Sequence, residues 1–341
     1  MDKVGLVTGG GDSPGINAAI RAVVRKSKDE EMEVVGFRNG WAGLLENDRQ
    51  VLTRNDVSGI LPIGGTLLGS SRTNPFSIQN GPEKAVEKYE QNDLDAIIAI
   101  GGDDTLGVAH KLRDYDINAV GIPQTIDNDL AETEYSIGFS SALTQVMKAV
   151  DQLHTTAYSH HRVMILEVMG RDSGWIALFG GLAGGADSIL VPEEPFKVKE
   201  VKGRIKEREA AGKHFSIVVI SEGASPEGLD QQITRETGTD SFGHVKLGGI
   251  GHYLKDQLDA ILDMPIRVTT LAYLQRGGEP TAFDRLLATR CGIAAVEYCL
   301  EGKFDHMTAF DGSKVEPVNL EKVIANSPKP IGHDLLKMKD L

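Results

Sequence analysis

The chain has 341 residues, of which 40% are hydrophobic and 25% are charged, and its formal net charge is −13. These values are typical of a globular protein long enough for two domains. The acidic balance argues against nucleic acid, whose backbone is bound by clustered Lys and Arg. No apolar run approaches the roughly 18 residues of a membrane span, and the N-terminus leads straight into a predicted strand, with no room for a signal peptide. We therefore expect a cytoplasmic protein.

The first predicted unit is a strand, a glycine-rich loop and a helix. Val4–Thr8 is predicted as a buried strand, residues 9–15 (GGGDSPG) break it, and an Ala- and Arg-rich helix follows from about Ile16 to Lys28. Glycines let backbone N–H groups approach an anion, and the helix N-terminus adds a positive dipole. The spacing fits neither the dinucleotide fingerprint nor the lysine-containing nucleotide loop. A phosphate cradle and a structural turn therefore both stay open.

Further glycine turns follow. After a short strand at Glu33–Phe37, a glycine pair at residues 64–65 leads to Arg72, which could reach an anion or lie as a solvated loop arginine. A strand at Leu94–Ile100 then ends in residues 101–105 (GGDDT), and a helix follows to about Arg113. Acids beside a phosphate cradle imply a divalent cation, because bare carboxylates would repel the ligand.

An acid pair follows the next predicted strand, Ile117–Ile122. On an extended backbone Asp127 and Asp129 point the same way. Such a pair suits proton abstraction from a hydroxyl or a magnesium ion that carries phosphates. Asp and Asn are also ordinary turn residues, so a plain turn is the alternative. All these loops are expected at the carboxyl ends of one parallel sheet, where such sheets bind ligands.

The second half of the chain repeats the alternation of strands and helices and predicts an α/β fold. Helices are predicted at about 136–156, 173–182, 251–261 and 284–300; strands at 163–168, 189–191, 216–220, 267–274 and 307–310; a surface segment at 224–246; and an irregular end. Cys291 and Cys299 lie eight residues apart in one predicted helix, about 12 Å along its axis. That is too far for a disulfide, so we expect two packing residues.

Seven segments together resemble the phosphofructokinase family. They are residues 8–17 (TGGGDSPGIN), 65–72 (GTLLGSSR), 101–105 (GGDDT), 123–129 (PQTIDND), 167–171 (EVMGR), 221–222 (SE) and 274–278 (LQRGG). They follow the family's order over roughly residues 3–310. Residues 18–21 (AAIR) and 174–178 (GWIAL) resemble most the bacterial and actinobacterial-type branch, which has both ATP and pyrophosphate users.

The resemblance implies a fold and a division of labour. It implies two Rossmann-like three-layer α/β domains with largely parallel sheets. Residues 1–138 and about 275–325 would bind the phosphoryl donor. Residues 139–274 and the C-terminal tail would bind the sugar phosphate.

The resemblance also implies the roles of the candidate residues. Asp127 would be the general base that accepts the proton of the sugar 1-hydroxyl, Asp129 would support magnesium and the developing charge, and Arg171 and Gly11 would complete the catalytic set. The donor would be bound by Gly10, Arg72, Gly102, Asp103, Asp104, Thr105 and Gln124, with Asp103 acting through Mg²⁺. The sugar phosphate would be bound by Thr125, Ile126, Arg162, Met169, Gly170, Glu222, Arg267, Tyr273, Gln275 and Arg276. Arg162 and Arg267 would reach in from a neighbouring subunit, which implies a homodimer or homotetramer with shared active sites.

Among the positions that depart from the family pattern, three bear on the choice of donor and acceptor. ATP users typically have glycine where this chain has Asp104, whose carboxylate would repel an ATP α-phosphate, so this position favours pyrophosphate. Pyrophosphate users normally have lysine where this chain has Gln124, which carries no charge and forms weaker bonds to an anion. Tyr273 stands where a histidine usually lies near the 6-phosphate; its hydroxyl can donate one bond but brings no charge.

The expected function is phosphorylation of fructose 6-phosphate to fructose 1,6-bisphosphate in glycolysis, with pyrophosphate favoured as donor. The same chemistry with ATP, or on another ketose phosphate such as sedoheptulose 7-phosphate, stays open. Remote alternatives are a non-catalytic regulatory subunit and a kinase of the NAD kinase type. The latter would share residues 101–105 but not residues 169–171 or 275–278.

Overall fold

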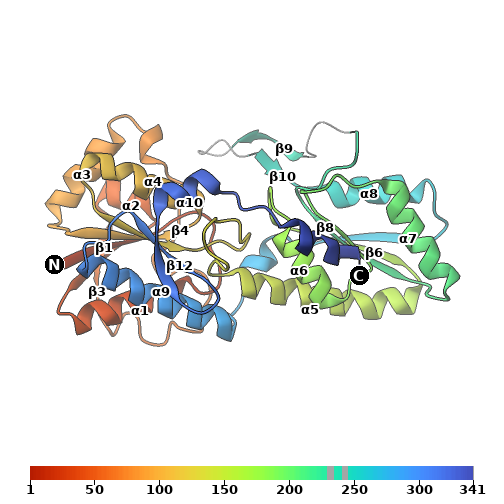
Figure 1. Ribbon diagram of the computed structural model, residues 1–341, viewed down its shortest axis with the longest axis horizontal. Helices are drawn as coiled ribbons and strands as arrows, with labels where there is room; N and C mark the ends of the chain where they lie inside the picture. The colour runs from red at the N-terminus through yellow and green to blue at the C-terminus, as the bar shows by residue number, and fades with distance from the viewer. Residues whose placement is uncertain (229–233, 240–244, 341) are drawn as a thin grey trace. The chain divides into compact units, whose positions relative to one another are not determined.

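The computed structural model describes residues 1–228, 234–239 and 245–340 (Figure 1). The chain divides into two compact units. Unit 1 contains Met1–Ser141 and Arg276–Pro328, and unit 2 contains the described residues of Ala142–Thr239, Val245–Gln275 and Lys329–Leu341. The sequence predicts domain boundaries between residues 138 and 139 and at about residues 274 to 275. The donor and sugar-phosphate roles of the two units stay predictions.

Unit 1 is built on a seven-stranded sheet, as far as its described residues go, in the order β13-β12-β5-β4-β1-β2-β3. Its strands are β1 (Lys3–Thr8), β2 (Glu33–Phe37), β3 (Arg49–Leu52), β4 (Ala96–Gly101), β5 (Ala119–Pro123), β12 (His306–Phe310) and β13 (Val315–Asn319). The central strands pair in parallel, and only the edge strands β3 and β13 are antiparallel. The loops after β1, β4 and β5 therefore lie along one edge of the sheet.

Helices cover both faces of this sheet. They are α1 (Ile16–Asp29), α2 (Trp41–Glu46), α3 (Gly81–Gln91), α4 (Asp103–Leu112), α9 (Ala282–Leu300) and α10 (Leu320–Asn326), with short 3₁₀ turns at Pro75–Ser77 and Arg113–Tyr115. Alternate strand residues enter different cores: Leu6 packs in the core of α1 and α9, and Val7 packs in that of α2, α3, α4 and α10. Figure 1 shows α1 and α9 on one side of the sheet and α4 and α10 on the other.

Unit 2 has a smaller parallel sheet of four strands among the residues described there, in the order β11-β6-β8-β7. The strands are β6 (Val163–Val168), β7 (Ser188–Leu190), β8 (Ser216–Ser221) and β11 (Ile266–Thr270). The helices are α5 (Phe139–His160, in this unit from Ala142), α6 (Trp175–Gly184), α7 (Val198–Ala210), α8 (Ile250–Asp259) and α11 (His333–Leu336), with 3₁₀ turns at Ala272–Arg276 and Lys337–Asp340. Helices α7 and α8 share a core with one sheet face. The prediction of an α/β fold with largely parallel sheets is confirmed.

Two predictions about elements are wrong, those for 267–274 and for the C-terminal end, and the prediction for 224–246 is incomplete. The strand predicted at 267–274 ends at Thr270, and Ala272, with φ 43°, turns the chain into the 3₁₀ turn Ala272–Arg276. The surface segment at 224–246 contains the antiparallel strands β9 (Thr234–Thr239) and β10 (Val245–Leu247), while residues 229–233 and 240–244 of it lie outside the described residues. The end predicted as irregular contains β13, α10 and α11.

The helices do not provide a membrane span. Within residues 1–228, 234–239 and 245–340, no helix combines the length and the apolar composition needed to cross a bilayer.

Candidate active site

The acid loop of unit 1 begins where β5 ends at Pro123. Residues 126–127 form a turn, and Asn128 follows in the left-handed region with φ 52°. The backbone here is therefore not extended, so the argument that Asp127 and Asp129 point the same way is wrong. The backbone N–H of Asp127 donates to Oγ1 of Thr125 over 3.1 Å, which ties the turn together.

The same loop is closed by the side chains of two buried residues. Nδ2 of Asn128 donates to the carbonyl of Glu134 (3.0 Å), and Oδ1 of Asn128 accepts from the backbone N–H of Ser136 (2.9 Å). Oγ of Ser136 donates to the carbonyl of Thr125 (2.6 Å). Sequence reasoning did not single out Asn128 and Ser136. The signal available for Asn128 was that asparagine tolerates a left-handed backbone better than most residues.

The glycine loop after β1 meets two other loops. The N–H of Gly10 donates to the carbonyl of Ser71 (3.1 Å), and Oγ of Ser70 donates to the carbonyl of Gly10 (2.6 Å). A Cβ on Gly9 would lie 2.5 Å from Oγ1 of Thr105, so only glycine allows this approach. The structure thus brings together Gly10, Thr105 and the segment that leads into Arg72.

Gln124 is 1% exposed and faces the glycine loop. Its Nε2 donates to the carbonyl of Gly11 (3.1 Å) and to Oγ of Ser13 (2.9 Å), so both amide hydrogens are used within unit 1. Ser13 in turn donates to the carbonyl of Ile137 (3.2 Å), at the end of the acid loop. Gln124 therefore links the glycine loop to the acid loop, and its contact with a donor stays a prediction.

Arg276, predicted to clamp the sugar phosphate, also lies against the glycine loop. Its Nη1 donates to the carbonyl of Asp12 over 3.1 Å. A Cβ on Gly11 would lie only 2.2 Å from Nη1 of Arg276. The absence of a side chain at Gly11 is therefore what lets the guanidinium reach this position.

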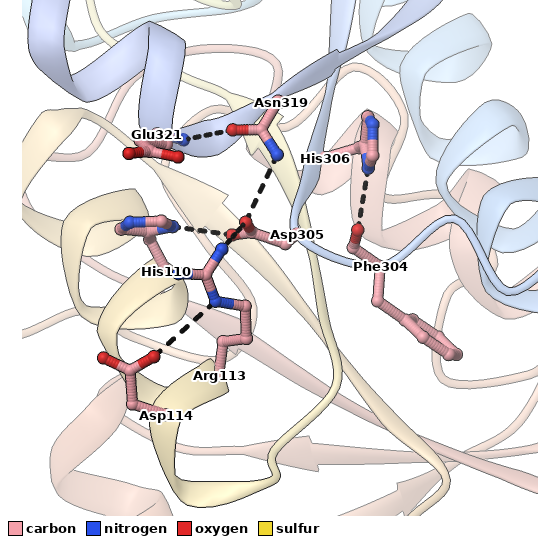
Figure 2. Close-up of polar contacts among 8 residues, drawn as sticks. All are labelled: His110, Arg113, Asp114, Phe304, Asp305, His306, Asn319 and Glu321. Carbon is pink, nitrogen blue, oxygen red and sulfur yellow. Dashed lines mark hydrogen bonds and ion pairs between the residues drawn. The ribbon is translucent and has the colours of Figure 1, made fainter.

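Helix α4 begins with the second acid pair. Gly102 is its N-cap, and Asp103 and Asp104 occupy its first turn, where the helix dipole stabilises negative charge. The other end of the helix is held by Asp305, which is 8% exposed. Figure 2 shows the carboxylate of Asp305 accepting from Nδ1 of His110 (2.7 Å) and Nη1 of Arg113 (2.7 Å). Helix α4 is thus fixed at the end remote from its acids.

In unit 2, predicted residues meet at the carboxyl ends of β6 and β8. Gly170 (φ 143°) and Arg171 (φ 49°) turn the chain sharply after β6, and the N–H of Met169 donates to Oε1 of Gln275 over 3.3 Å. The N–H of Glu222 donates to the carbonyl of Val168 (2.8 Å). A Cβ on Gly223 would lie 1.8 Å from the carbonyl oxygen of Arg171, so these two loops are in direct contact.

Two predicted arginines lie near the other ends of the strands of this sheet, where β6 and β11 begin. Arg162 precedes β6, and Arg267 is the second residue of β11, paired with Met164. A strand rises roughly 3.3 Å per residue, which places Arg162 about 20 Å from the turn at Arg171. The structure therefore does not bring Arg162 and Arg267 together with Met169, Gly170 and Arg171.

The side chain of Tyr273, which was predicted to lie near the 6-phosphate, is 79% exposed.

The described residues thus form an α/β protein of two units, with glycine turns, acids and arginines near the ends of its strands. The family model for phosphofructokinase matches residues 3–299. The chain is 50% identical over 326 residues to the pyrophosphate–fructose 6-phosphate 1-phosphotransferase of Amycolatopsis mediterranei (strain S699), covering 95% of this chain and 94% of the relative. It is 47% identical over 323 residues to ATP-dependent 6-phosphofructokinase 3 of Streptomyces coelicolor (strain ATCC BAA-471 / A3(2) / M145), covering 94% of each.

Solved structures agree. The crystal structure of the pyrophosphate-dependent phosphofructokinase from Marinobacter aquaeolei aligns with a TM-score of 0.84 at 26% identity, covering 97% of this chain and 86% of that one. The chain belongs to the phosphofructokinase family. It is a phosphotransferase, which confirms the enzyme class predicted from the sequence.

Proposed function

We propose that this phosphofructokinase transfers a phosphoryl group from inorganic pyrophosphate to the 1-hydroxyl of fructose 6-phosphate, giving fructose 1,6-bisphosphate and inorganic phosphate. The observation that carries the choice of donor is Asp104, beside Asp103 in the first turn of α4. Like charges a few ångströms apart near a protein surface repel by a few kcal/mol. A carboxylate at position 104 therefore disfavours the α-phosphate of ATP, a group that pyrophosphate does not have.

On the acceptor side, Asp127 is the proposed general base. Its carboxylate takes the proton of the 1-hydroxyl while that oxygen attacks the donor phosphorus and inorganic phosphate leaves. Phosphoryl transfer depends mainly on such positioning and on charge stabilisation. The hydrogen bonds that close the acid loop support this role, because they fix the backbone on both sides of Asp127. Arg171 and Gly11 complete the proposed catalytic set.

Magnesium is the proposed cofactor, held by Asp103 and Asp129. No group of three or more His, Cys, Asp or Glu side chains able to hold a metal occurs among the residues that the structure describes. Two carboxylates nonetheless fit Mg²⁺, which often takes one or two carboxylates and completes its octahedron with phosphate oxygens and water. When bound, the ion would neutralise charge on the donor phosphates.

The sugar phosphate is proposed to bind Met169, Gly170, Arg171 and Glu222 through its hydroxyls and Arg276 through its phosphate. Arg162 and Arg267 lie near the starts of β6 and β11, away from the turn at Arg171. They would therefore serve the active site of a neighbouring subunit. A homodimer or homotetramer with shared sites follows. We assign the reaction to glycolysis, and hence to the cytoplasm.

ATP as the main donor is the second candidate. It is favoured by Gln124, whose neutral amide is already bonded to Gly11 and Ser13 and does not replace the positive charge of a lysine. Tyr273 brings no positive charge to the sugar phosphate, which keeps another acceptor, such as sedoheptulose 7-phosphate, open. A non-catalytic regulatory subunit is disfavoured, because Asp127, Asp129 and Arg171 are all present.

The test is an assay coupled to fructose 1,6-bisphosphate formation, with magnesium and fructose 6-phosphate, run with pyrophosphate and with ATP. The proposal expects turnover with pyrophosphate and a much lower kcat/KM with ATP. Turnover mainly with ATP would contradict the proposed donor. Turnover with sedoheptulose 7-phosphate alone would contradict the proposed acceptor.

A further inference from the structure

The buried side chain of Asn128 helps to hold the loop that carries Asp127. Asn128 is 2% exposed, and its amide bonds in two directions. Nδ2 donates to the carbonyl of Glu134 (3.0 Å), while Oδ1 accepts from the N–H of Ser136 (2.9 Å) and lies 3.3 Å from its Oγ. One side chain therefore fastens the outgoing part of the loop to its return, eight residues later.

The backbone of Asn128 sets the direction of its neighbours. Its φ of 52° lies in the left-handed region, which asparagine tolerates because its short amide can bond locally. Asn128 directly follows Asp127, so the change in chain direction at Asn128 helps to set where the Asp127 carboxylate is presented. Removing the amide bonds of Asn128 would disturb that placement without removing the acid.

The bonds around Asp127 form a closed circuit. Oγ of Ser136 donates to the carbonyl of Thr125 (2.6 Å), and Oγ1 of Thr125 accepts from the N–H of Asp127 (3.1 Å). The circuit returns to Asp127 through Asn128, which is covalently attached to it. The circuit is also anchored outside the loop, because the carboxylate of Asp284 accepts from the N–H groups of Gly138 (3.0 Å) and Ser141 (2.7 Å).

We propose that Asn128 is a positioning residue for phosphoryl transfer, holding the Asp127 carboxylate in the orientation that accepts the proton of the acceptor hydroxyl. This inference rests on the proposed function of Asp127 as base. Asn128 itself need not touch the substrate, because both the nitrogen and the oxygen of its amide are bonded inside the loop. Misplacing a catalytic group by about 1 Å can lower a rate on the order of 10²-fold.

The first variant is Asn128→Gly, which keeps the left-handed backbone accessible and removes both arms of the amide. We expect kcat to fall about 10- to 100-fold, with the KM for fructose 6-phosphate changed less than about threefold, because the sugar contacts proposed in unit 2 are untouched. Asn80→Gly is the matched control. Asn80 is also in unit 1 and left-handed (φ 55°), but it is exposed and its side chain does not cap helix α3. Its kcat should stay at the wild-type value.

The decisive readout is the same change in an Asp127→Ala background. If Asn128 acts through Asp127, Asn128→Gly lowers the residual rate of Asp127→Ala by less than about twofold, since interacting residues are not additive. An equal loss in both backgrounds would show a merely structural role and overturn the proposal. Unchanged activity of Asn128→Gly would overturn it as well.

A folding defect and a failure of the proposed function are separable from these outcomes. If thermal unfolding shows that Asn128→Gly is not folded, Ser136→Ala takes its place in the same cycle, since it removes the Oγ bond to Thr125 and keeps the N–H bond to Asn128. A folded wild type that does not phosphorylate fructose 6-phosphate overturns the proposed function and this inference together. An active wild type with additive losses overturns this inference alone.

Discussion

At the scale of single residues, Asp127 shows how much depends on local backbone. Spacing alone predicts two acids that point the same way on an extended backbone, whereas the structure has a turn and the left-handed Asn128 at this place. The motif identified the right segment, but its geometry comes from hydrogen bonds to Thr125, Glu134 and Ser136. Those partners lie up to eight residues away from Asn128, so residue spacing could not predict them.

The first prediction concerns the proposed base. Asp127→Ser removes the proton acceptor, and we expect kcat for fructose 6-phosphate to fall about 10²- to 10⁴-fold. Binding of the sugar should change little, so KM stays within a few-fold. Steady-state kinetics check this, and a variant with the wild-type rate would remove Asp127 from the mechanism.

The second prediction concerns the thiols. Cys291 and Cys299 are fully buried in the core of unit 1, free of disulfide bonding, as expected for packing residues. Burial disfavours the charged thiolate and raises the pKa of each thiol to about 12. Only the thiolate is a nucleophile, so below that pH both remain protonated and inert.

We expect the native protein at pH 8 to resist a thiol reagent, and both thiols to react after denaturation. Counting the labelled thiols by mass spectrometry checks this. Stoichiometric labelling of a protein that keeps its native circular dichroism would contradict the buried placement.

At the scale of elements, helix α4 links the proposed donor acids to a polar anchor. Asp305 holds the end of α4 through His110 and Arg113, and Nδ2 of Asn319, the N-cap of α10, reaches the same carboxylate (3.3 Å; Figure 2). Asp114 also contacts Arg113 (3.7 Å) but is exposed. Arg113 therefore contacts two acids, the buried Asp305 and the exposed Asp114.

The third prediction uses that pair. Asp305→Asn leaves buried donors partly unsatisfied and should lower the free energy of unfolding by about 1–3 kcal/mol; half-exposed Arg113 keeps the loss toward the low end. Asp114→Asn should change it by less than about 0.5 kcal/mol. Urea unfolding of both variants provides the measurement. Equal effects would show that Asp305 is not an anchor.

The elements predicted best are those with a strong apolar run. Strand β6 was predicted with the bounds it has, because every residue of Val163–Val168 is buried. Helix α7 was not predicted, since its sequence is mostly charged and only Val201 and Ile205 are buried. The strand predicted at 267–274 failed because Tyr273 and Leu274, although apolar, lie at the surface.

At the scale of the whole molecule, the family and the α/β class followed from motifs along the chain, and the comparisons confirm both. The family resemblance implies that Arg162 and Arg267 reach the site of a neighbouring subunit, and this role stays a prediction. In unit 2 both arginines lie near the starts of strands β6 and β11, away from the turn at Arg171, and this leads to a test of assembly.

The fourth prediction is complementation. Arg162→Ala and Asp127→Ser should each be nearly inactive alone. If Arg162 serves a neighbour's site, subunits of the two variants mixed after dissociation should regain part of the activity, because some sites then combine an intact Asp127 with an intact Arg162. The test compares the rate of the mixture with the sum of the rates of the two separate variants. A fully active monomer, or a mixture no faster than the sum, would contradict shared sites.

We propose that Asp104 makes pyrophosphate the donor. The most direct measurement is the ratio of kcat/KM for pyrophosphate to that for ATP, taken for the wild type and for Asp104→Gly under the same magnesium and fructose 6-phosphate. We predict a wild-type ratio well above one and a fall of at least about tenfold in the variant, which corresponds to 1.4 kcal/mol of removed repulsion. A wild type that prefers ATP, or a ratio unchanged by Asp104→Gly, would contradict the claim.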